Sequence, residues 1–305
     1  MIHKRFPGPS NARTRQFTTL LLLSASLVWT LSAACTPTEA DSDAEMLAMV
    51  ALATGSVSMP VSLVANDQSV SCNQSFTVGS GNTSVQIKDF RVYLSEFAWI
   101  TPDGEVSATL PDITGWQKDN VVLIDLEDGT GFCSGTGTTD TNSQVVLSSP
   151  PANATGLAFS VGLPASQNDL NNTTSDAPFN IAQMYWAWAS GFKFANFELS
   201  ADGVNAYRFH LGSIDCSGSR ASDCARAMKG RIQINNVNVA TGIQFDVKDW
   251  FDGLAFATQP CMGASDPTTA LSDGGRCQTL RERMGINHTT GAGNPANAKG
   301  FELRQ

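Results

Sequence analysis

The stretch VQIKDFRVYLSEFAWI, residues 85–100, decides the fold class of this chain. It is rich in the β-branched and aromatic residues that strands favour, and part of it alternates between apolar and polar side chains. Similar segments recur at residues 120–127, 155–164, 191–200, 205–213 and 229–239. Turn-forming residues separate these segments, and no helical pattern is interleaved with them. The sequence therefore predicts an all-β fold, a β-sandwich rather than an α/β fold.

The connections between the predicted strands are long. Residues 127–142, EDGTGFCSGTGTTDTN, are rich in Gly and Thr and exceed the length of a hairpin turn. Near the end of the chain, residues 248–257 and 277–285 have the character of short helices. There is no internal repeat and no clear domain boundary. We expect one sandwich domain over residues 57–305, with long loops, disulfide staples and short C-terminal helices.

The N-terminal residues 1–34 have the pattern of a secretory signal peptide. A basic start is followed by the apolar run LLLLSASLVWTLSAA at residues 20–34, which is short for a spanning helix. Cys35 follows small residues, as at a bacterial lipoprotein processing site, although Ser32 stands where such sites usually have Leu. We expect residues 35–56 to be a lipid anchor and flexible tether. The predicted location is the periplasm or the outer cell surface.

The charge of the exported chain limits its partners. The whole chain has 19 basic and 28 acidic residues, and the predicted signal peptide holds four of the basic ones and no acidic one. The remainder therefore has 15 basic against 28 acidic residues, a net charge of −13. So acidic a protein is repelled by phosphate backbones, which argues against nucleic acid as a partner. No other apolar run is long enough to cross a membrane, so contact with the membrane is expected only through the lipid.

Six cysteines follow Cys35, an even number that suits disulfides in an oxidising compartment: Cys72, Cys133, Cys216, Cys224, Cys261 and Cys277. The sequence allows fifteen pairings. The simplest joins the local pairs Cys216–Cys224 and Cys261–Cys277 and leaves Cys72–Cys133 as a long-range link, which the chain-entropy model values at roughly 4 kcal/mol. A thiolate metal site is the rival interpretation, but no C-x-x-C pair is present.

Histidine is scarce. His3 lies in the predicted signal peptide, so only His210 and His288 remain, which weakens any multi-histidine zinc or copper site. His288 is in a polar, Gly-rich segment and is expected to be exposed. His210 shares a strand face with Arg208, and on local grounds a surface or hydrogen-bonded histidine is the commoner outcome. The signature motifs of hydrolases, metalloproteases, phosphate loops, dinucleotide sites and c-type haem attachment are absent from the sequence.

Acidic residues stand close to the ends of predicted strands and loops: Asp89, Asp125, Glu127 and Asp128. Their spacing does not single out a catalytic pair. Asp125 has an ordinary structural explanation, because an aspartate at a strand end can accept hydrogen bonds from nearby backbone amides.

The stretch MYWAWASGFKF, residues 184–194, contains two of the six tryptophans. In a strand, Met184, Trp186 and Trp188 would share one face. Such a row is either a bulky piece of core or a prepared site, and from this stretch alone core packing is the commoner outcome.

The order of several blocks resembles the MbnP family of exported copper-binding proteins, also known as the four-cysteine member of the metallo-mystery pair. The blocks are KDFRVYLSEFAW, then WQ followed by VVLIDLEDGTGFC, then GLAFSVGLPASQND, MYWAWASGFKF and FHLGSIDC. They extend over most of residues 60–230. The W-x-W followed by Gly-aromatic-Lys-Phe, and the His-Leu-Gly-Ser before a cysteine, are the most specific of them.

The resemblance implies a site and a partner. In that family a di-haem protein of the cytochrome c peroxidase/MauG superfamily oxidises the first tryptophan of W-x-W to kynurenine, and the product binds one Cu(I). Here Trp186 would be modified, Trp188 would be its companion and His210 the imidazole ligand. Met184 is a further candidate donor, although core packing is its commoner role. The family's four cysteines would be Cys72, Cys133, Cys216 and Cys224.

Kynurenine formation has a chemical rationale. An indole N–H only donates, whereas the opened ring has an aromatic amine and a ketone that can face a metal. Cu(I) is soft and accepts imidazole, thioether or amine donors.

One position departs from the family pattern. Relatives often have Asn-His after the Val-Gly-x-Pro block, whereas this chain has Asn168-Asp169. As a harder donor, Asp169 would weaken a Cu(I) site. His210, a kynurenine at position 186 and one unidentified donor then remain.

The resemblance leads to one main prediction and two rivals. We expect a Cu(I)-binding protein of copper homeostasis that is the substrate of a redox partner and not an enzyme. One rival is a non-metal extracellular binding or adhesion module. The other is a secreted hydrolase that uses His210 with an acid such as Asp125 or Asp169.

Overall fold

The computed structural model describes residues 55–187, 189–203, 205–218, 220–236, 239, 242–256, 260–262 and 275–303. The predicted signal peptide, Cys35, the tether up to residue 54 and Trp188 lie outside these residues. Strands dominate the described part, which has three short α-helices. Its structure confirms the predicted all-β class. No helix in the described part is long and apolar enough to cross a bilayer.

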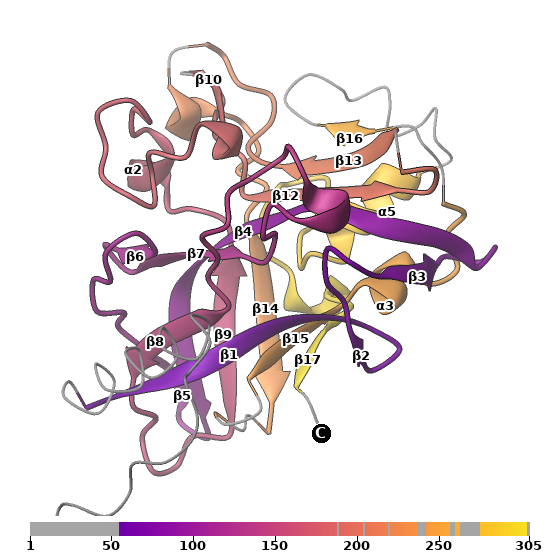
Figure 1. Ribbon diagram of the computed structural model, residues 1–305. Coiled ribbons are helices and arrows are strands. Elements are labelled where there is room, and N and C mark those ends of the chain that lie inside the picture. Colours follow the sequence, from indigo (N-terminus) through magenta and orange to yellow (C-terminus); the bar gives the residue numbers. More distant parts are fainter. Residues whose placement is uncertain are drawn as a thin grey trace, which may run out of the picture. The chain divides into compact units, whose positions relative to one another are not determined.

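The stretch quoted first forms the central strand of the larger sheet, β4 (Thr83–Thr101). The first half of β4 pairs with β12 (Ala195–Ser200), and its second half pairs with β9 (Gly156–Val161). The main path through the sheet is β14-β9-β4-β12-β13-β16 (Figure 1). The other strands of this sheet are β3 (Ser75–Val78), β5 (Gly104–Ser107), β6 (Gln117–Lys118), β7 (Val121–Asp125), β13 (Ala206–Leu211), β14 (Gly230–Asn235) and β16 (Cys261–Met262).

A smaller sheet packs against the larger one. It is built from β1 (Ser56–Ala65), β2 (Gln68–Ser69), β8 (Gln144–Ser148), β15 (Ile243–Asp246) and β17 (Phe301–Leu303). Aromatic rings join the two sheets: Phe245 lies 5.9 Å from Phe90 and 5.4 Å from Phe197, measured between ring centroids. The facing apolar sides form one continuous core. The predicted β-sandwich is therefore confirmed.

Both predicted helices near the end of the chain are present. The first, α3 (Val247–Phe251), begins where the Asp246 carboxylate accepts hydrogen bonds from the amides of Lys248 and Asp249. It is shorter than predicted, because Gly253 with φ 70° turns the chain away. The second is α5 (Arg276–Glu282), and a third short helix, α2 (Ala165–Asn168), lies in a loop.

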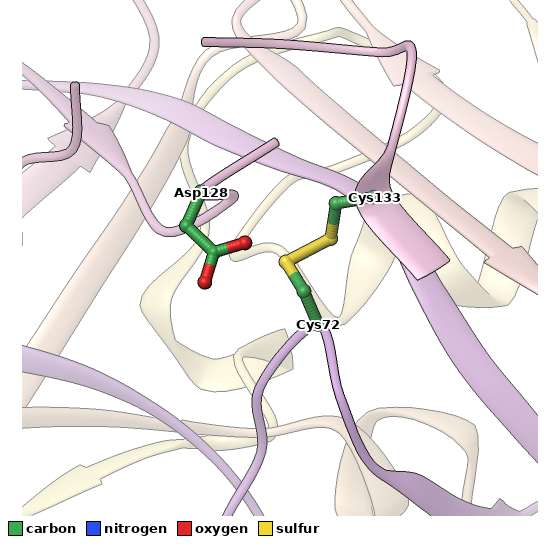
Figure 2. A group of neighbouring side chains, drawn as sticks. All are labelled: Cys72, Asp128 and Cys133. Atoms are coloured by element: carbon green, nitrogen blue, oxygen red, sulfur yellow. A yellow bond between two sulfur atoms is a disulfide. The ribbon is translucent and has the colours of Figure 1, made fainter. Parts of the chain in front are cut away.

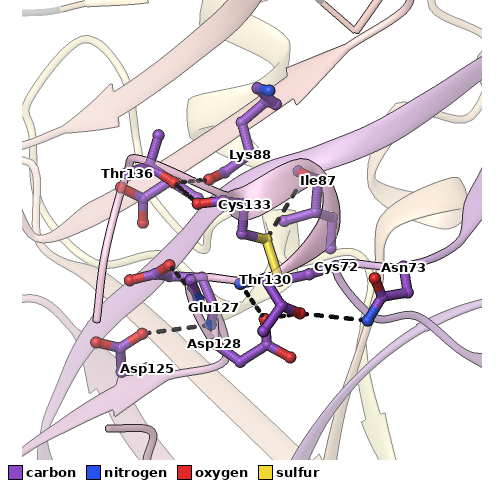
Figure 3. Close-up of a disulfide and its surroundings, with 12 residues drawn as sticks. Cys72, Asn73, Ile87, Lys88, Asp125, Glu127, Asp128, Thr130, Cys133 and Thr136 are labelled. Atoms are coloured by element: carbon purple, nitrogen blue, oxygen red, sulfur yellow. Dashed lines mark hydrogen bonds between the residues drawn. A yellow bond between two sulfur atoms is a disulfide. The ribbon is translucent and has the colours of Figure 1, made fainter. Parts of the chain in front are cut away.

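Three disulfides join the six cysteines in the simplest of the fifteen pairings: Cys72–Cys133, Cys216–Cys224 and Cys261–Cys277. Figure 3 shows the first, which holds the short 3-10 turn Gly131–Cys133 against β4 through contacts with Ile87. The Phe132 amide also donates to the Cys72 carbonyl at 2.8 Å. This link therefore anchors the long Gly-rich loop, residues 127–142, over the larger sheet.

Candidate metal centre

A row of polar side chains crosses one face of the larger sheet. Register pairs place these residues directly opposite one another from β7 to β16: Asp125, Arg91, Asn196, His210 and Met262. Residues opposite one another on neighbouring strands project from the same face. The first four are at most 6% exposed, whereas Met262 is 41% exposed. The row therefore begins in the protein interior and ends at an accessible edge strand.

His210 has a carboxylate partner in the next register row. Its Nε2 lies 3.0 Å from Oε1 of Glu198, which also lies 3.5 Å from Nε of Arg208. Because a carboxylate accepts, Nε2–H donates and Nδ1 is left with a free lone pair. No described residue hydrogen-bonds to Nδ1. Carboxylates that hold the second nitrogen of a metal-binding histidine in this way fix its tautomer and orientation.

The surroundings keep this imidazole neutral. Burial lowers the pKa of His210, and the hydrogen bond to Glu198 opposes that effect only in part. Burial acts against ionisation of Glu198 too, but the hydrogen bond from His210 and the charges of Arg208 and Lys193 leave its pKa lowered. The pair is thus a neutral imidazole beside a carboxylate, the protonation state that binds a metal ion.

Trp186 lies beside the end of the strand that carries His210. It is half-buried on the two-stranded ribbon of β10 (Tyr185–Ala187) and β11 (Gly191–Phe192). A Cβ placed on Gly212 would lie 2.6 Å from Cζ3 of Trp186 and 2.8 Å from the Phe192 carbonyl oxygen. The benzene part of the indole therefore packs directly on Gly212, two residues after His210. The Trp186 ring thus lies against the chain two residues after His210.

Met184 belongs to the core. The strand begins only at Tyr185, because residues Ala182–Met184 form a 3-10 turn, so the predicted alternation does not extend back to Met184. Its side chain is 0% exposed. The structure favours the packing role for this methionine.

Asp169 is already engaged elsewhere. Its Oδ1 accepts from the Ser222 amide at 2.8 Å, its Oδ2 accepts from the Ser222 hydroxyl at 2.6 Å, and Nε of Arg220 lies 3.5 Å from Oδ2. It thereby fastens α2 to the loop closed by Cys216–Cys224. Neither Asp169 nor Asp125 forms a hydrogen bond or ion pair with His210 in the described structure; the carboxylate beside His210 is Glu198.

The ligand atoms of Cys72, Cys133 and Asp128 lie within 4.8 Å of one another. Figure 2 shows the Asp128 carboxylate near the sulfur atoms of the two cysteines. The two sulfur atoms are bonded to each other, so they are not thiolate ligands. Asp128 accepts from the amide and hydroxyl of Thr130. This cluster is a structural staple, and it does not support a thiolate metal site.

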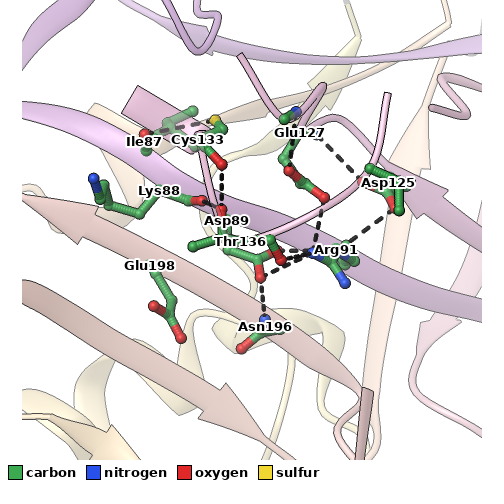
Figure 4. A network of polar contacts seen from close by, with 12 residues as sticks. Ile87, Lys88, Asp89, Arg91, Asp125, Glu127, Cys133, Thr136, Asn196 and Glu198 are labelled. Carbon is green, nitrogen blue, oxygen red and sulfur yellow. Dashed lines mark hydrogen bonds and ion pairs between the residues drawn. The ribbon is translucent and has the colours of Figure 1, made fainter. Parts of the chain in front are cut away.

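Arg91 is the centre of a buried acidic cluster that spacing alone did not predict (Figure 4). Its guanidinium lies 2.8 Å from Glu127, 3.2 Å from Asp89 and 3.5 Å from Asp125. Asp125 also accepts from the Glu127 amide, as expected for an aspartate at a strand end. Burial raises the pKa of Asp89 to about 8 and that of Asp125 to about 7, although Arg91 lowers both. Burial also raises the pKa of Glu127, so one cation faces three carboxyl groups with raised pKa values.

His288 differs from its prediction. It is half-buried rather than exposed, and its Nδ1 is buried without a hydrogen-bond partner among the described residues. Burial lowers its pKa, helped by the charges of Arg281 and Arg226. The Gly-rich segment around it packs on Arg226, which donates to the His288 carbonyl at 2.9 Å.

Comparison with known proteins identifies the family. A family model described as MbnP matches residues 54–265. The chain belongs to the MbnP family. Among solved structures, MbnP from Methylosinus trichosporium is 23% identical, with a TM-score of 0.66 over 82% of this chain and 99% of that one. At this identity the likeness shows a shared fold. No curated protein matches the chain.

We expect the absence of a side chain at Gly212 to be essential for the stability of this MbnP-family chain. Gly212→Ala should destabilise the fold by about 1–3 kcal/mol, because the added methyl overlaps both the Trp186 ring and a carbonyl oxygen. Urea unfolding and near-ultraviolet circular dichroism will measure the change. Gly81→Ala is the matched control, since its methyl would only touch the Thr83 hydroxyl at 3.6 Å. Equal stability and equal spectra for the two variants would contradict the packing described.

Proposed function

We propose that this chain is an exported Cu(I)-binding protein whose site is completed when a di-haem partner oxidises Trp186 to kynurenine. The observation that supports it best is the packing of the Trp186 ring on Gly212, two residues after His210. The resemblance selected Trp186 and His210, which lie 24 residues apart in the chain. The packing of the Trp186 ring two residues after His210 supports a role for both in one site.

The residues present fit a single soft cation. His210 offers Nδ1, while Glu198 holds its other nitrogen. The half-buried position of Trp186 leaves part of its ring accessible, as oxidation by a docked protein requires. The nearby carboxylates of Asp169 and Glu198 are engaged by protein donors, so hard oxygen ligands do not dominate the site. Such a donor set suits Cu(I) better than a cation that prefers oxygen.

In this proposal the chain is a substrate of its partner and has no catalytic residue. Trp186 supplies the indole. An oxidant activated at the haems of the partner would break the indole C2–C3 bond and add one oxygen atom to each carbon, and water would then release C2 as formate. The kynurenine that remains has one carbon fewer and one oxygen more than tryptophan. Gly212 lies against the benzene ring that survives the conversion. The aniline nitrogen that forms therefore stays on a ring that packs on Gly212, two residues after His210. Bound copper would supply the link between these two nitrogen donors.

The deciding experiment is the mass of the peptide that contains Trp186. The protein is produced with and without its di-haem partner, and both samples are digested and sequenced by tandem mass spectrometry. We expect loss of one carbon and gain of one oxygen at Trp186 only when the partner is present. One equivalent of copper should accompany the modified form alone.

The other tryptophans of the same sample serve as internal controls. Trp99 and Trp250 are each 1% exposed and should keep their mass under both conditions. An unmodified Trp186 in both samples, together with no bound copper, would refute the proposal and favour a non-metal binding module.

A further inference from the structure

We infer that Met262 is the third donor of the copper site and supplies its thioether sulfur. The inference rests on the proposed function, since it names a ligand of that same site. Nothing in the sequence selected Met262, because it lies 52 residues from His210 and outside the W-x-W region. The structure places the two residues side by side.

The first argument is register. Strand β16 runs parallel to β13, with Cys261 opposite Phe209 and Met262 opposite His210. Neighbouring strands lie about 4.8 Å apart, so the side chains of His210 and Met262 leave the same face as direct neighbours. An imidazole and an unbranched thioether at this separation can reach one ion between them. Figure 1 shows β13 and β16 together at the edge of the sheet.

The second argument is how β16 is held. This strand has only two residues, which pair with nothing but β13 in the described sheet. Cys261 points inward, where it is 1% exposed, bonds to Cys277 of α5 and accepts a hydrogen bond from the Tyr207 hydroxyl at 3.0 Å. Because side chains alternate, this anchoring forces Met262 outward onto the face of His210. The disulfide thus fixes the position of the thioether.

The third argument is exposure. Met262 and Val106 are the large apolar side chains that stand exposed in the described structure, and Met262 is 41% exposed. Methionines usually fill gaps in the core, as Met184 does here at 0% exposure. An exposed thioether beside an imidazole is a soft ligand pair suited to Cu(I).

The test compares Met262→Leu with Met184→Leu, two variants that remove one sulfur at nearly constant volume. Both are co-produced with the di-haem partner, and the kynurenine content at position 186 is measured by mass spectrometry. Cu(I) affinity per modified chain is then measured by competition with a chromogenic chelator, and the copper environment by X-ray absorption. We expect Met262→Leu to weaken Cu(I) binding roughly tenfold or more and to abolish the Cu–S signal, with Met184→Leu unchanged.

A readout on the unsubstituted protein complements the variants. With methyl-labelled methionine, Cu(I) should shift the Met262 resonance strongly and that of Met184 weakly. Unchanged affinity and a retained Cu–S signal in Met262→Leu would overturn the inference and leave the proposed function standing. A fully modified wild-type protein that binds no Cu(I) would overturn both.

Discussion

Trp186→Phe is expected to reduce copper binding from one ion per chain to background. Phenylalanine keeps an aromatic ring on Gly212 but has no indole nitrogen, so oxidation cannot generate the aromatic amine that the proposed site requires. The protein is co-produced with its partner, and bound copper is quantified by elemental analysis. Because Trp186 is only half-buried, we expect the free energy of unfolding to fall by no more than about 1–2 kcal/mol.

The matched control is Tyr185→Phe, the neighbouring residue on β10. The Tyr185 ring packs on Phe192 with 5.0 Å between centroids, so the variant keeps this contact and removes only a hydroxyl group. It should retain full copper loading. Copper bound equally by wild type, Trp186→Phe and Tyr185→Phe would show that the site does not depend on Trp186, even if the protein is a copper protein.

Arg91→Met is expected to destabilise the protein by about 3–5 kcal/mol at pH 8.5, the second large effect. The substitution leaves Asp89, Asp125 and Glu127 buried around an apolar side chain, and unpaired buried charges have costs of this size. Urea unfolding at pH 8.5 and at pH 6 measures the effect. Arg91→Lys, which keeps the charge but not the planar fork of donors, should show a smaller loss.

The pH dependence has a definite sign. Carboxyls with raised pKa values hold protons in the folded state that the unfolded chain has released, so their stabilising contribution is complete at low pH and is lost as pH rises through the folded pKa. With pKa values of about 8 for Asp89 and about 7 for Asp125, wild-type stability should fall between pH 5 and about 8. In Arg91→Met the fall should be steeper, so the variant regains stability at pH 6. Stability that rises with pH across this window would contradict the raised pKa values.

Much of the fold could be predicted because its signals are local. β-branched and aromatic residues in segments of strand length, separated by turn residues, predicted β4, β7, β9, β12, β13 and β14. The hydrophobic pattern of a strand does not determine which other strand it pairs with. The division into two sheets, and the parallel pairing of β13 with β16, depend on contacts between distant segments.

The candidate site was predicted in part for the same reason. Trp186 and His210 were found through motifs, whereas Glu198, Gly212 and Met262 were not. Glu198 had only a weak signal in the sequence, because it lies two residues after Asn196 and therefore on the same face of a predicted strand. Which residues of the neighbouring strand lie near Glu198 is decided by the register between the two strands. The role of Gly212 becomes visible only when the Trp186 ring is placed against it. Asp169, which the sequence offered as a ligand, proved to be fastened to Ser222 and Arg220.

The sequence by itself determined the β-sandwich class, an even set of cysteines whose simplest pairing is the observed one, and the W-x-W and His-Leu-Gly-Ser motifs. Only the tertiary structure decided that the Trp186 ring rests on Gly212, that Met262 stands opposite His210, and that Arg91 gathers three buried carboxyls. The reason is that strand propensity, turn chemistry and motifs act over a few neighbouring residues. Register across a sheet joins residues tens of positions apart, and burial and hydrogen bonding at those junctions are properties of the packed chain alone.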